Sequence, residues 1–401
     1  MGDESSKRTM RMAIILASAL VLMPAVTWFG ARLLPHAQYA IGLALFEEDS
    51  LLGQDPARGA EFIRRAAERQ LASAQYDLGR MYHNGLGVTR SDTEALRWFR
   101  LAAEQQHNIA EHALGYVYAN ARGVPRDETE ATKWFLRGAE HGLALSQFTM
   151  GERYRLGRGV AQDDGEAVRW FSLAAGQQLA EAENALGLMY SSGRGLPPDD
   201  AEANRWFRRA AEQGLGGAQL NLGLQYMLGR GTPRDDVEAV RWLKLAADQQ
   251  YSRAQATLGF MHLNGRGVPQ SYAEALRFLQ WAASENDADG LYYLGFMYDL
   301  GRGVQQDEKE ALRLYRLAVR EGQPLAQKDL GLMYLSGRGV PLDSIRAYMW
   351  ILVALKGGAS IPEGAELRDQ LAKILTPTQR RQAEAEARAC KASSFTQCGE
   401  P

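Results

Sequence analysis

The chain has few of the residues that usually build a metal site or a catalytic site. Only two of its 401 residues are cysteine, Cys390 and Cys398, and both lie in the C-terminal tail. The six histidines form no i, i+4 pair and none recurs with a cysteine or carboxylate at ligand spacing, so we expect no metal. The formal net charge is −2, which provides no overall attraction to nucleic acid.

Recognisable nucleophile motifs are absent as well. No Gly-x-Ser-x-Gly turn or Ser-x-x-Lys block stands in a fitting context. The paired carboxylates Asp163-Asp164 and Asp199-Asp200 lie where helices are expected to begin, and helix capping explains them. We therefore predict no catalytic residue, no cofactor and no small-molecule substrate, and we predict that the protein is not an enzyme.

Long apolar runs are also absent, with one exception near the N-terminus. Residues 12–31 contain no charge, and Lys7, Arg8 and Arg11 precede them. Twenty residues span roughly the 30 Å of a bilayer core, and preceding positive charges favour a cytoplasmic N-terminus. The run predicts a cytoplasmic segment over 1–11 and an anchor over 12–31, with the remaining chain exported. A cleaved signal peptide, with residues 13–23 as its apolar region, is the alternative.

Glycine, by contrast, is abundant and strictly periodic. A first series recurs every 36 residues, at Gly79, Gly115, Gly151, Gly187, Gly223, Gly259, Gly295 and Gly331. A second series keeps the same phase, at Gly87, Gly123, Gly159, Gly195, Gly231, Gly267, Gly303 and Gly339. A fixed period of this length is typical of a solenoid, in which each unit buries its apolar face by stacking on its neighbours.

Each unit is predicted to contain two helices. Apolar residues recur at spacings 0, 4, 7 and 8 over 74–82, and at 0, 3, 4, 7 and 8 over 95–103. The second helix should begin at a Ser or Asp with Glu three residues later, as in a capping box. The cap residues are Ser91, Asp127, Asp163, Asp199, Asp235, Ser271, Asp307 and Asp343. A tryptophan row at the same period, from Trp98 to Trp242, is in phase with the buried alanines and is interpreted as core.

The segment GLMYSSGRGL at 187–196 could be mistaken for a phosphate-binding loop. It recurs in every unit, however, and it lacks both the preceding strand and the Gly-Lys-Ser/Thr of such loops. We interpret Gly-Arg-Gly as a helix corner, whose glycines adopt positive φ. The intervening arginines are expected to be solvated or paired with nearby carboxylates; a ladder for an anionic polymer is the alternative.

This pattern resembles the Sel-1-like repeat, a relative of the tetratricopeptide repeat. The matching residues are Ala-x-x-x-Leu-Gly-x-Met-Tyr, Gly-x-Gly-Val, Asp-x-x-Glu-Ala and Trp-Phe-x-x-Ala-Ala. The resemblance implies an all-α fold, a right-handed superhelical α-solenoid that acts as a protein-interaction scaffold. We expect a degraded first repeat over 32–71, the repeat solenoid over 72–358, and C-terminal capping helices with a tail over 359–401.

In such a solenoid the first helix of each repeat should line a concave groove. Positions 73, 76, 80, 83 and 84, and their equivalents at 36-residue steps, are expected to face it. The candidate partner-binding residues are Tyr76, Arg80, His112, Tyr116, Arg155, Leu188, Leu224, Met227, Phe260, Leu263, Tyr292, Phe296 and Leu332. The alternative is that position 80 packs between adjacent first helices.

The predicted function is a non-enzymatic scaffold or adaptor of the bacterial cell envelope that binds a protein segment in this groove. The predicted location is the inner membrane, single-pass, with the repeats in the periplasm, or periplasmic or secreted after cleavage. A hydrolase acting on cell-wall or β-lactam substrates and a secreted host-interaction factor are the alternatives. If the tail is exported, a disulfide between Cys390 and Cys398 is expected.

Overall fold

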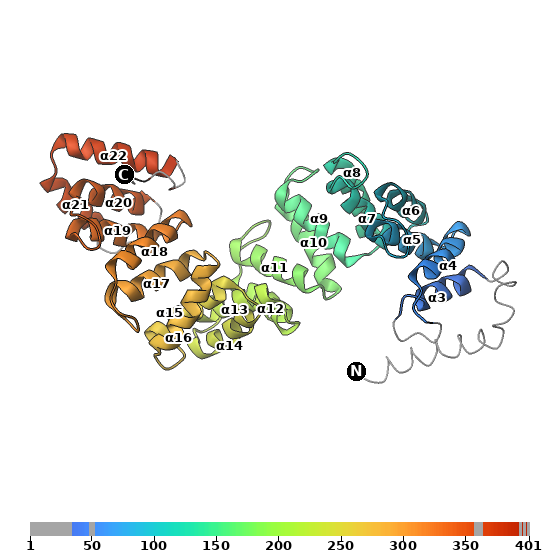
Figure 1. Ribbon diagram of the computed structural model, residues 1–401, viewed down its shortest axis with the longest axis horizontal. Helices are drawn as coiled ribbons and strands as arrows, with labels where there is room; N and C mark the ends of the chain where they lie inside the picture. The colour runs from blue at the N-terminus through green and yellow to red at the C-terminus, as the bar shows by residue number, and fades with distance from the viewer. Residues whose placement is uncertain (1–33, 48–52, 357–363, 393–394, 396–397, 399–401) are drawn as a thin grey trace. The chain divides into compact units, whose positions relative to one another are not determined.

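The computed structural model describes residues 34–47, 53–356, 364–392, 395 and 398, and within them every regular element is a helix. The chain divides into two compact units, with the boundary after Ala182, inside helix α11. Each unit is a stack of helix pairs, which confirms the predicted all-α repeat solenoid (Figure 1). The handedness of the superhelix stays a prediction.

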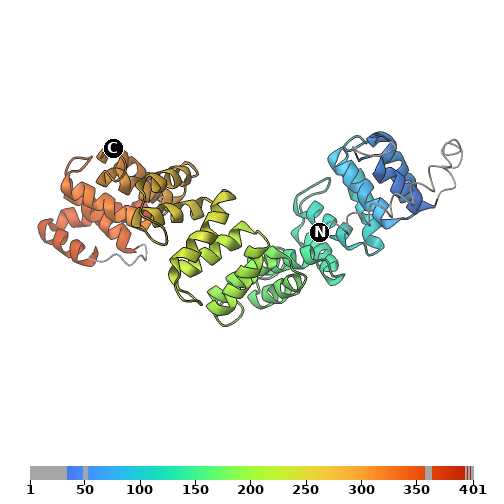
Figure 2. The same ribbon diagram turned by 90° about the horizontal axis from the view of Figure 1, so that it is seen from below.

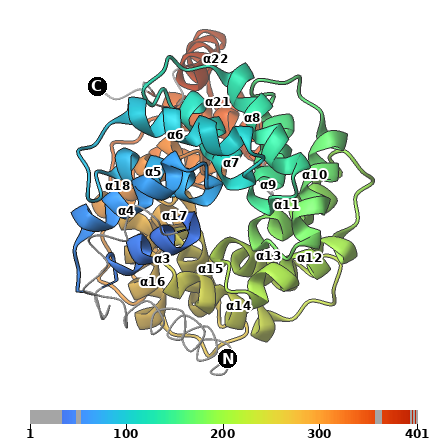
Figure 3. The ribbon, with the colours of Figure 1, turned by 90° about the vertical axis from the view of Figure 1, so that its right-hand side faces the viewer.

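Unit 1 is built from successive pairs of antiparallel neighbours, a helix A followed by a helix B. The pairs can be followed in Figure 3. The bounds are α3 (Pro35–Ala44) with α4 (Pro56–Glu68), α5 (Ala72–Asn84) with α6 (Asp92–Glu104), α7 (Asn108–Ala119) with α8 (Glu128–Glu140), and α9 (Ala144–Leu156) with α10 (Asp164–Gly176).

Unit 2 continues the same order and ends in two further helices (Figure 2). Its pairs are α11 (Ala180–Ser192) with α12 (Asp200–Glu212), α13 (Gly216–Leu228) with α14 (Asp236–Asp248), α15 (Ser252–Asn264) with α16 (Tyr272–Ser284), α17 (Ala288–Leu300) with α18 (Glu308–Arg320), and α19 (Pro324–Ser336) with α20 (Ser344–Lys356). The last helices are α21 (Gly364–Ile374) and α22 (Pro377–Ala392).

The first glycine series lets the two helices of a pair approach closely. A Cβ on Gly79 would lie 2.6 Å from a ring carbon of Phe99, and a Cβ on Gly295 would lie 2.9 Å from the ring of Tyr315. Those distances are too short for any side chain, so the ring of helix B occupies the space that the glycine leaves empty. Leu243, Leu279 and Ile351 fill the same space against Gly223, Gly259 and Gly331. The 36-residue period therefore records one contact per repeat between a glycine and a large side chain of helix B.

The corner prediction is confirmed. Gly85 and Gly87 have φ of 73° and 67°, the left-handed region that glycine adopts at little cost. The second corner glycine also touches the preceding repeat, because a Cβ on Gly87 would lie 2.1 Å from the carbonyl oxygen of Pro56. Each corner is therefore both a turn and a contact between repeats.

The capping boxes form only in part. The cap side chains accept the backbone N–H three residues on, for example Asp127 from Glu130 at 2.9 Å. The glutamates do not reach back, because the backbone N–H of each cap already donates to helix A, as Asp127 does to the Tyr118 carbonyl at 3.0 Å. Glu130 instead pairs with Lys133, at 3.0 Å. A complete box occurs at α22, where Thr376 and Gln379 bond reciprocally.

The tryptophan row belongs to the stack, although its members are not equally buried. Trp98, Trp170 and Trp242 are buried, whereas Trp134 and Trp206 are only half-buried. The half-buried rings lie under the guanidinium groups of Arg137 and Arg209, at 4.7 and 4.6 Å. An Arg thus covers the face of the ring that the core leaves open.

The C-terminal helices α21 and α22 both pack on α20, the last helix B. Cys390, at the end of α22, is joined to Cys398 by a disulfide. The Phe395 backbone N–H donates to the Cys390 carbonyl at 3.0 Å inside that loop. The C-terminal end of unit 2 is therefore closed by helices and a covalent loop, where a further repeat would otherwise stack.

The predicted location in a membrane requires correction. Within the part of the chain that the structure describes, no helix combines the length and the apolar character needed to cross a bilayer. The predicted anchor at 12–31 and the segment 1–11 lie outside the described residues. The assignment as a single-pass inner-membrane protein is therefore withdrawn.

Candidate functional site

The A helices present one face that the core does not cover. In each A helix, the equivalents of positions 74, 78 and 79 are buried against helix B, and those of 80 and 84 lie on the opposite side. Successive A helices place the position-80 side chains one repeat apart. The chemistry of this face differs between the two units, so each is described by itself.

In unit 1 the side chains at position 80 of α5, α7 and α9 are polar or aromatic, and several polar side chains of the face are tied to one another. The Tyr76 ring stacks on His107, with centroids 5.2 Å apart. Arg80 is exposed, lies over the Tyr76 ring at 5.8 Å and pairs with Asp77 at 3.2 Å. Burial raises the pKa of Tyr76 and lowers that of His107, so both are neutral near pH 7.

The other predicted unit 1 residues follow the same polar pattern. His112 is half-buried, lies 3.0 Å from the Ser146 hydroxyl through Nδ1, and has its pKa lowered to about 4 by desolvation. Tyr116 is 47% exposed. Arg155 pairs with Glu152 at 2.6 Å. This face therefore offers neutral rings and paired charges, together with the exposed apolar side chains of Ile109, Leu145 and Leu156 at positions 73 and 84.

In unit 2 the position-80 equivalents are all apolar. We call this set the unit 2 row: Leu188, Leu224, Phe260, Phe296 and Leu332. Leu188 is 48% exposed and the other four are half-buried. The row comes from α11, α13, α15, α17 and α19 and crosses five repeats. Met227, also predicted, is half-buried one turn from Leu224.

Two predicted members do not lie on the surface. Leu263 is 1% exposed and Tyr292 is 6% exposed, so both pack in the core. The Tyr292 ring contacts Tyr315 at 5.7 Å and its hydroxyl donates to Asp329 at 3.0 Å. That burial raises the pKa of the Tyr292 hydroxyl. Leu263, at the equivalent of position 83, and Tyr292, at the equivalent of position 76, were expected to face the groove and instead belong to the core of unit 2.

Other surface residues escaped the sequence analysis. Leu228 and Leu300, the last residues of α13 and α17, are 53% and 45% exposed. Tyr293 is half-buried and its ring lies 5.0 Å from Phe260, which widens the aromatic part of the row. Leu228 and Leu300 are equivalents of position 84, which the sequence analysis had placed on the face, so they could have been predicted. Tyr293 is the equivalent of position 77, which had not been placed there.

The corner arginines flank the row. Arg266 lies over the Phe260 ring at 5.7 Å and pairs with Asp236 at 2.7 Å. The hydrogen bonds from Arg234 and then from Arg266 depress the pKa of the Asp236 carboxyl. Arg302 lies over the Phe296 ring at 5.1 Å. The cation over each aromatic member of the row is therefore supplied by the corner of the same repeat.

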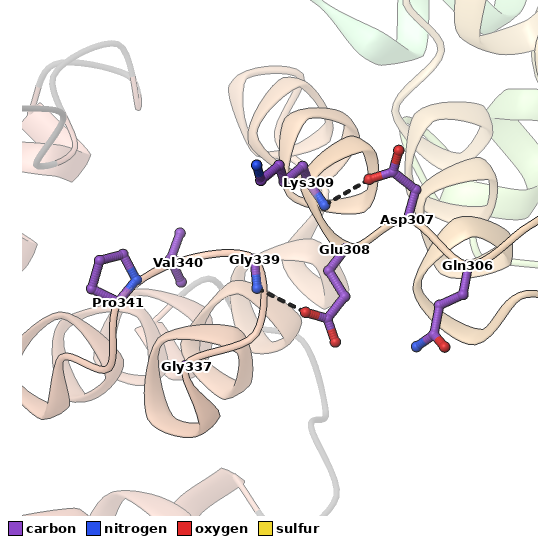
Figure 4. Close-up of a pocket in the computed structure, with 8 residues that line it drawn as sticks. All are labelled: Gln306, Asp307, Glu308, Lys309, Gly337, Gly339, Val340 and Pro341. Carbon is purple, nitrogen blue, oxygen red and sulfur yellow. Dashed lines mark hydrogen bonds between the residues drawn. The ribbon is translucent and has the colours of Figure 1, made fainter.

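An open cavity of about 540 Å³ lies elsewhere in unit 2, where the corner at 337–341 meets the start of α18 (Figure 4). Two backbone N–H groups of its lining are already bonded within the chain. The Gly339 N–H donates to Glu308 at 3.0 Å, and the Lys309 N–H donates to the Asp307 cap at 3.0 Å. We interpret this cavity as the ordinary space beneath a corner.

Metal-binding chemistry is not indicated by the described residues, among which no group of three or more His, Cys, Asp or Glu side chains is placed to hold an ion. The histidines near the A-helix face have different neighbours: His83 lies beside the Asp92 carboxylate, His112 beside the Ser146 hydroxyl, and His107 against the Tyr76 ring. What the face can do is bind by apolar contact and by single charge pairs.

The repeats match the Sel1 repeat family over residues 35–71, 72–107, 108–143, 144–178, 180–215, 217–251, 252–287, 288–323 and 324–358. The chain belongs to this family, which confirms the resemblance seen in its sequence. The match also includes the segment that had been expected to be a degraded first repeat. Proteins built from Sel1 repeats are generally scaffolds for protein–protein interaction and are typically non-enzymatic.

Two solved structures are similar over most of the chain. The first is c5321, a protective antigen of uropathogenic Escherichia coli strains, with 28% identity, a TM-score of 0.63, and coverage of 90% of this chain and 93% of that one. The second is a Sel1 repeat protein from Oxalobacter formigenes, with 32% identity, a TM-score of 0.56, and coverage of 78% and 89%. Among curated proteins, none matches the chain.

Proposed function

We propose that the protein is a non-enzymatic scaffold whose unit 2 row binds a segment of a partner protein. The observation that carries the proposal is the row itself, five successive apolar side chains on one face of the A helices, none of them fully buried. Position 80 is free to vary, because unit 1 holds Arg80, Tyr116 and Glu152 there. An apolar run at a position that tolerates charge is typical of an interaction surface.

The dimensions of the row suit a helix or an extended segment. Packed helices lie about 8–10 Å apart. Of the A helices of the row, α15 and α17 pack on each other, so Phe260 and Phe296 have nearly the spacing of residues i and i+7 on a helix, roughly 10.5 Å. A partner that presents aliphatic residues at that interval would contact several repeats at once. Phe260 and Phe296, with Tyr293 beside them, are the expected anchors.

The test is a selection of peptides from a displayed random library with the full-length chain, followed by titration of the resynthesised peptides. We expect Phe260→Ser with Phe296→Ser to weaken binding at least about tenfold, since buried aromatic anchors dominate such interfaces. Tyr116→Ser, on the unit 1 face, is the matched control and should leave binding unchanged.

Both phenylalanines are half-buried, so circular dichroism must show that the double variant is folded. Leu228→Ser with Leu300→Ser changes side chains that are 53% and 45% exposed, more than either phenylalanine, and serves as the second variant. It should weaken binding without changing the melting temperature. Selection of no peptide, or binding that both double variants leave intact, would contradict the proposal.

A further inference from the structure

Arg302 is a corner arginine of unit 2 that lies over an aromatic ring of the row. Neither of the two carboxylate positions that pair with corner arginines in other repeats holds a carboxylate here. Two corners show what is missing. Arg266 pairs with Asp236, 30 residues earlier, and Arg338 pairs with Asp299, 39 residues earlier, at 2.8 Å. The residues at those intervals from Arg302 are Tyr272 and Leu263.

The geometry around Arg302 is otherwise that of its neighbours. Residue 272 lies against this corner, since the Cβ of Tyr272 is 2.5 Å from where a Cβ on Gly303 would stand. Leu263 is buried and apolar. Among the described residues no carboxylate lies within ion-pair distance of the Arg302 side chain, whose guanidinium stays half-exposed above Phe296. Arg230, the other corner without such a pair, is exposed and lies over no ring.

We propose that Arg302 is the charge-recognition residue of the unit 2 row, and that the partner segment carries a carboxylate beside its aliphatic anchors. This inference rests on the proposed function and adds the chemistry of the partner. A guanidinium that lies over an aromatic ring can still donate its N–H groups to a carboxylate. The apolar row beside Arg302 favours a peptide segment as the partner, because a polyanion without apolar groups would leave the leucines of the row exposed to water.

The carboxylate also decides between related partners. A segment with a lysine at the same place would set two cations against each other beside an apolar surface, which disfavours binding. An uncharged segment would bury Arg302 without a partner and lose the charge-assisted hydrogen bond. Arg302 therefore acts on selectivity, while the row supplies most of the contact area.

Tyr272→Asp provides a test at a distance from the row. Asp is the residue at the equivalent first position of α6, α10, α12 and α14, so the substitution suits the fold. The new carboxylate should pair with Arg302 as Asp236 does with Arg266, and so compete with the partner. Tyr272→Asn, which removes the same ring without adding charge, is the matched control.

The experiment repeats the library selection on the full-length chain and its variants. Peptides selected by the wild type should combine aliphatic residues with Asp or Glu, and replacing that acid by its amide should weaken them about tenfold. Arg302→Gln and Tyr272→Asp should remove this preference for the acid. Arg266→Gln, at a corner that is already neutralised, and Tyr272→Asn should keep it.

The outcomes separate this inference from the function on which it rests. Aliphatic peptides that need Phe260 and Phe296, but bind equally as acid or amide, would overturn the role of Arg302 and leave the proposed function standing. Unchanged preference in Tyr272→Asp would overturn it as well. Selection of no peptide, with heparin binding that depends on Arg302, would assign the cation to a polyanion and contradict both.

Discussion

Helix α9 of unit 1 and helix α15 of unit 2 hold the same place in their repeats, yet they bury opposite chemistry. At the position where α15 has Met261, completely buried, α9 has Arg153, 6% exposed. The Arg153 guanidinium donates to the Thr132 hydroxyl at 2.7 Å and to the Glu128 carboxylate at 2.6 Å. The two helices are equal in length, and each packs a glycine closely on helix B, Gly151 on Phe171 and Gly259 on Leu279.

The difference teaches that the repeat constrains the backbone and leaves side-chain polarity to the neighbours. A buried charge is tolerated only if it is paired and hydrogen-bonded. Unit 1 meets that condition with Thr132 on α8, where α14 of unit 2 has Val240. The A-helix faces differ likewise at position 80, which is polar or aromatic in α5, α7 and α9 of unit 1 and apolar in unit 2, where Arg302 has no carboxylate partner among the described residues.

The largest effect is expected when an arginine is introduced into unit 2 at the position equivalent to Arg153. Met261→Arg should destabilise unit 2 by about 3–5 kcal/mol or more, because Val240 offers the guanidinium no hydrogen bond. Hydrogen exchange should report loss of protection in α13–α17 and little change in α5–α7, since solenoid repeats interact only with their neighbours.

The reciprocal change Arg153→Met is the control. It should cost no more than about 1 kcal/mol, since Glu128 keeps Arg126 as a partner at its exposed side. If both substitutions proved equally costly in denaturant titrations, the tolerance of unit 1 would not depend on Thr132.

The next largest effect concerns the dependence of stability on pH, which we expect from a buried histidine of unit 1. His112 in unit 1 has its folded pKa lowered to about 4 by burial, below its ordinary value of 6.5. Its unfolded form binds the proton more tightly, so the stability it contributes is present above pH 6.5 and is lost as pH falls toward 4. The full span amounts to about 3 kcal/mol. Urea titrations at several pH values would measure it.

His112→Phe tests the assignment, because Phe148 holds the equivalent place in α9. The variant should lose the slope of stability between pH 4 and 6.5 that comes from His112. It should retain the slopes from His107 and His262, whose pKa values burial also lowers, and those from the carboxyls Glu183, Asp289 and Asp329, whose pKa values burial raises. An unchanged slope would place the proton uptake on other groups.

Periodicity alone predicted most of the fold. The glycine series located the helix pairs and the corners, since a close contact and a positive φ each exclude other residues wherever they recur. The half-formed capping boxes were not predicted, because the competing donor–acceptor pair joins a cap to a carbonyl of helix A nine residues earlier. That bond depends on how the corner closes, which the spacing of Ser or Asp and Glu does not encode.

The surface was harder to predict than the core for a related reason. Helical phase predicted that Tyr292 and Leu263 face the groove, whereas both are buried among the side chains of the core. For Tyr292, burial follows from Tyr315, which replaces the usual Phe or Leu and stacks on it. The sequence showed Arg302 as one of a series of corner arginines. That it has no carboxylate partner becomes evident only from the structure, in which corner arginines pair with residues 30 or 39 positions earlier.

The covalent loop at the end of unit 2 has no counterpart in the described part of unit 1. Reduction of Cys390–Cys398 should lower the free energy of opening α22 by about 2–3 kcal/mol, as expected for a short closed loop. Hydrogen exchange with and without reductant should show the change in α20–α22 alone. Equal loss of protection in unit 1 would mean that the disulfide stabilises more than the terminal helices.

The smallest expected effect concerns what the units share. Arg169 pairs with Glu166 at 2.9 Å and lies over Trp170 in unit 1, and Arg241 pairs with Glu238 at 3.3 Å and lies over Trp242 in unit 2. Both arginines are exposed, so replacing either with Ala should cost less than about 1 kcal/mol, from a screened i, i+3 pair and a cation–π contact. Thermal melts in low and high salt would measure both. Equal small losses would show that this face is common to the two units; a large loss at one site alone would make it a further point where the units differ.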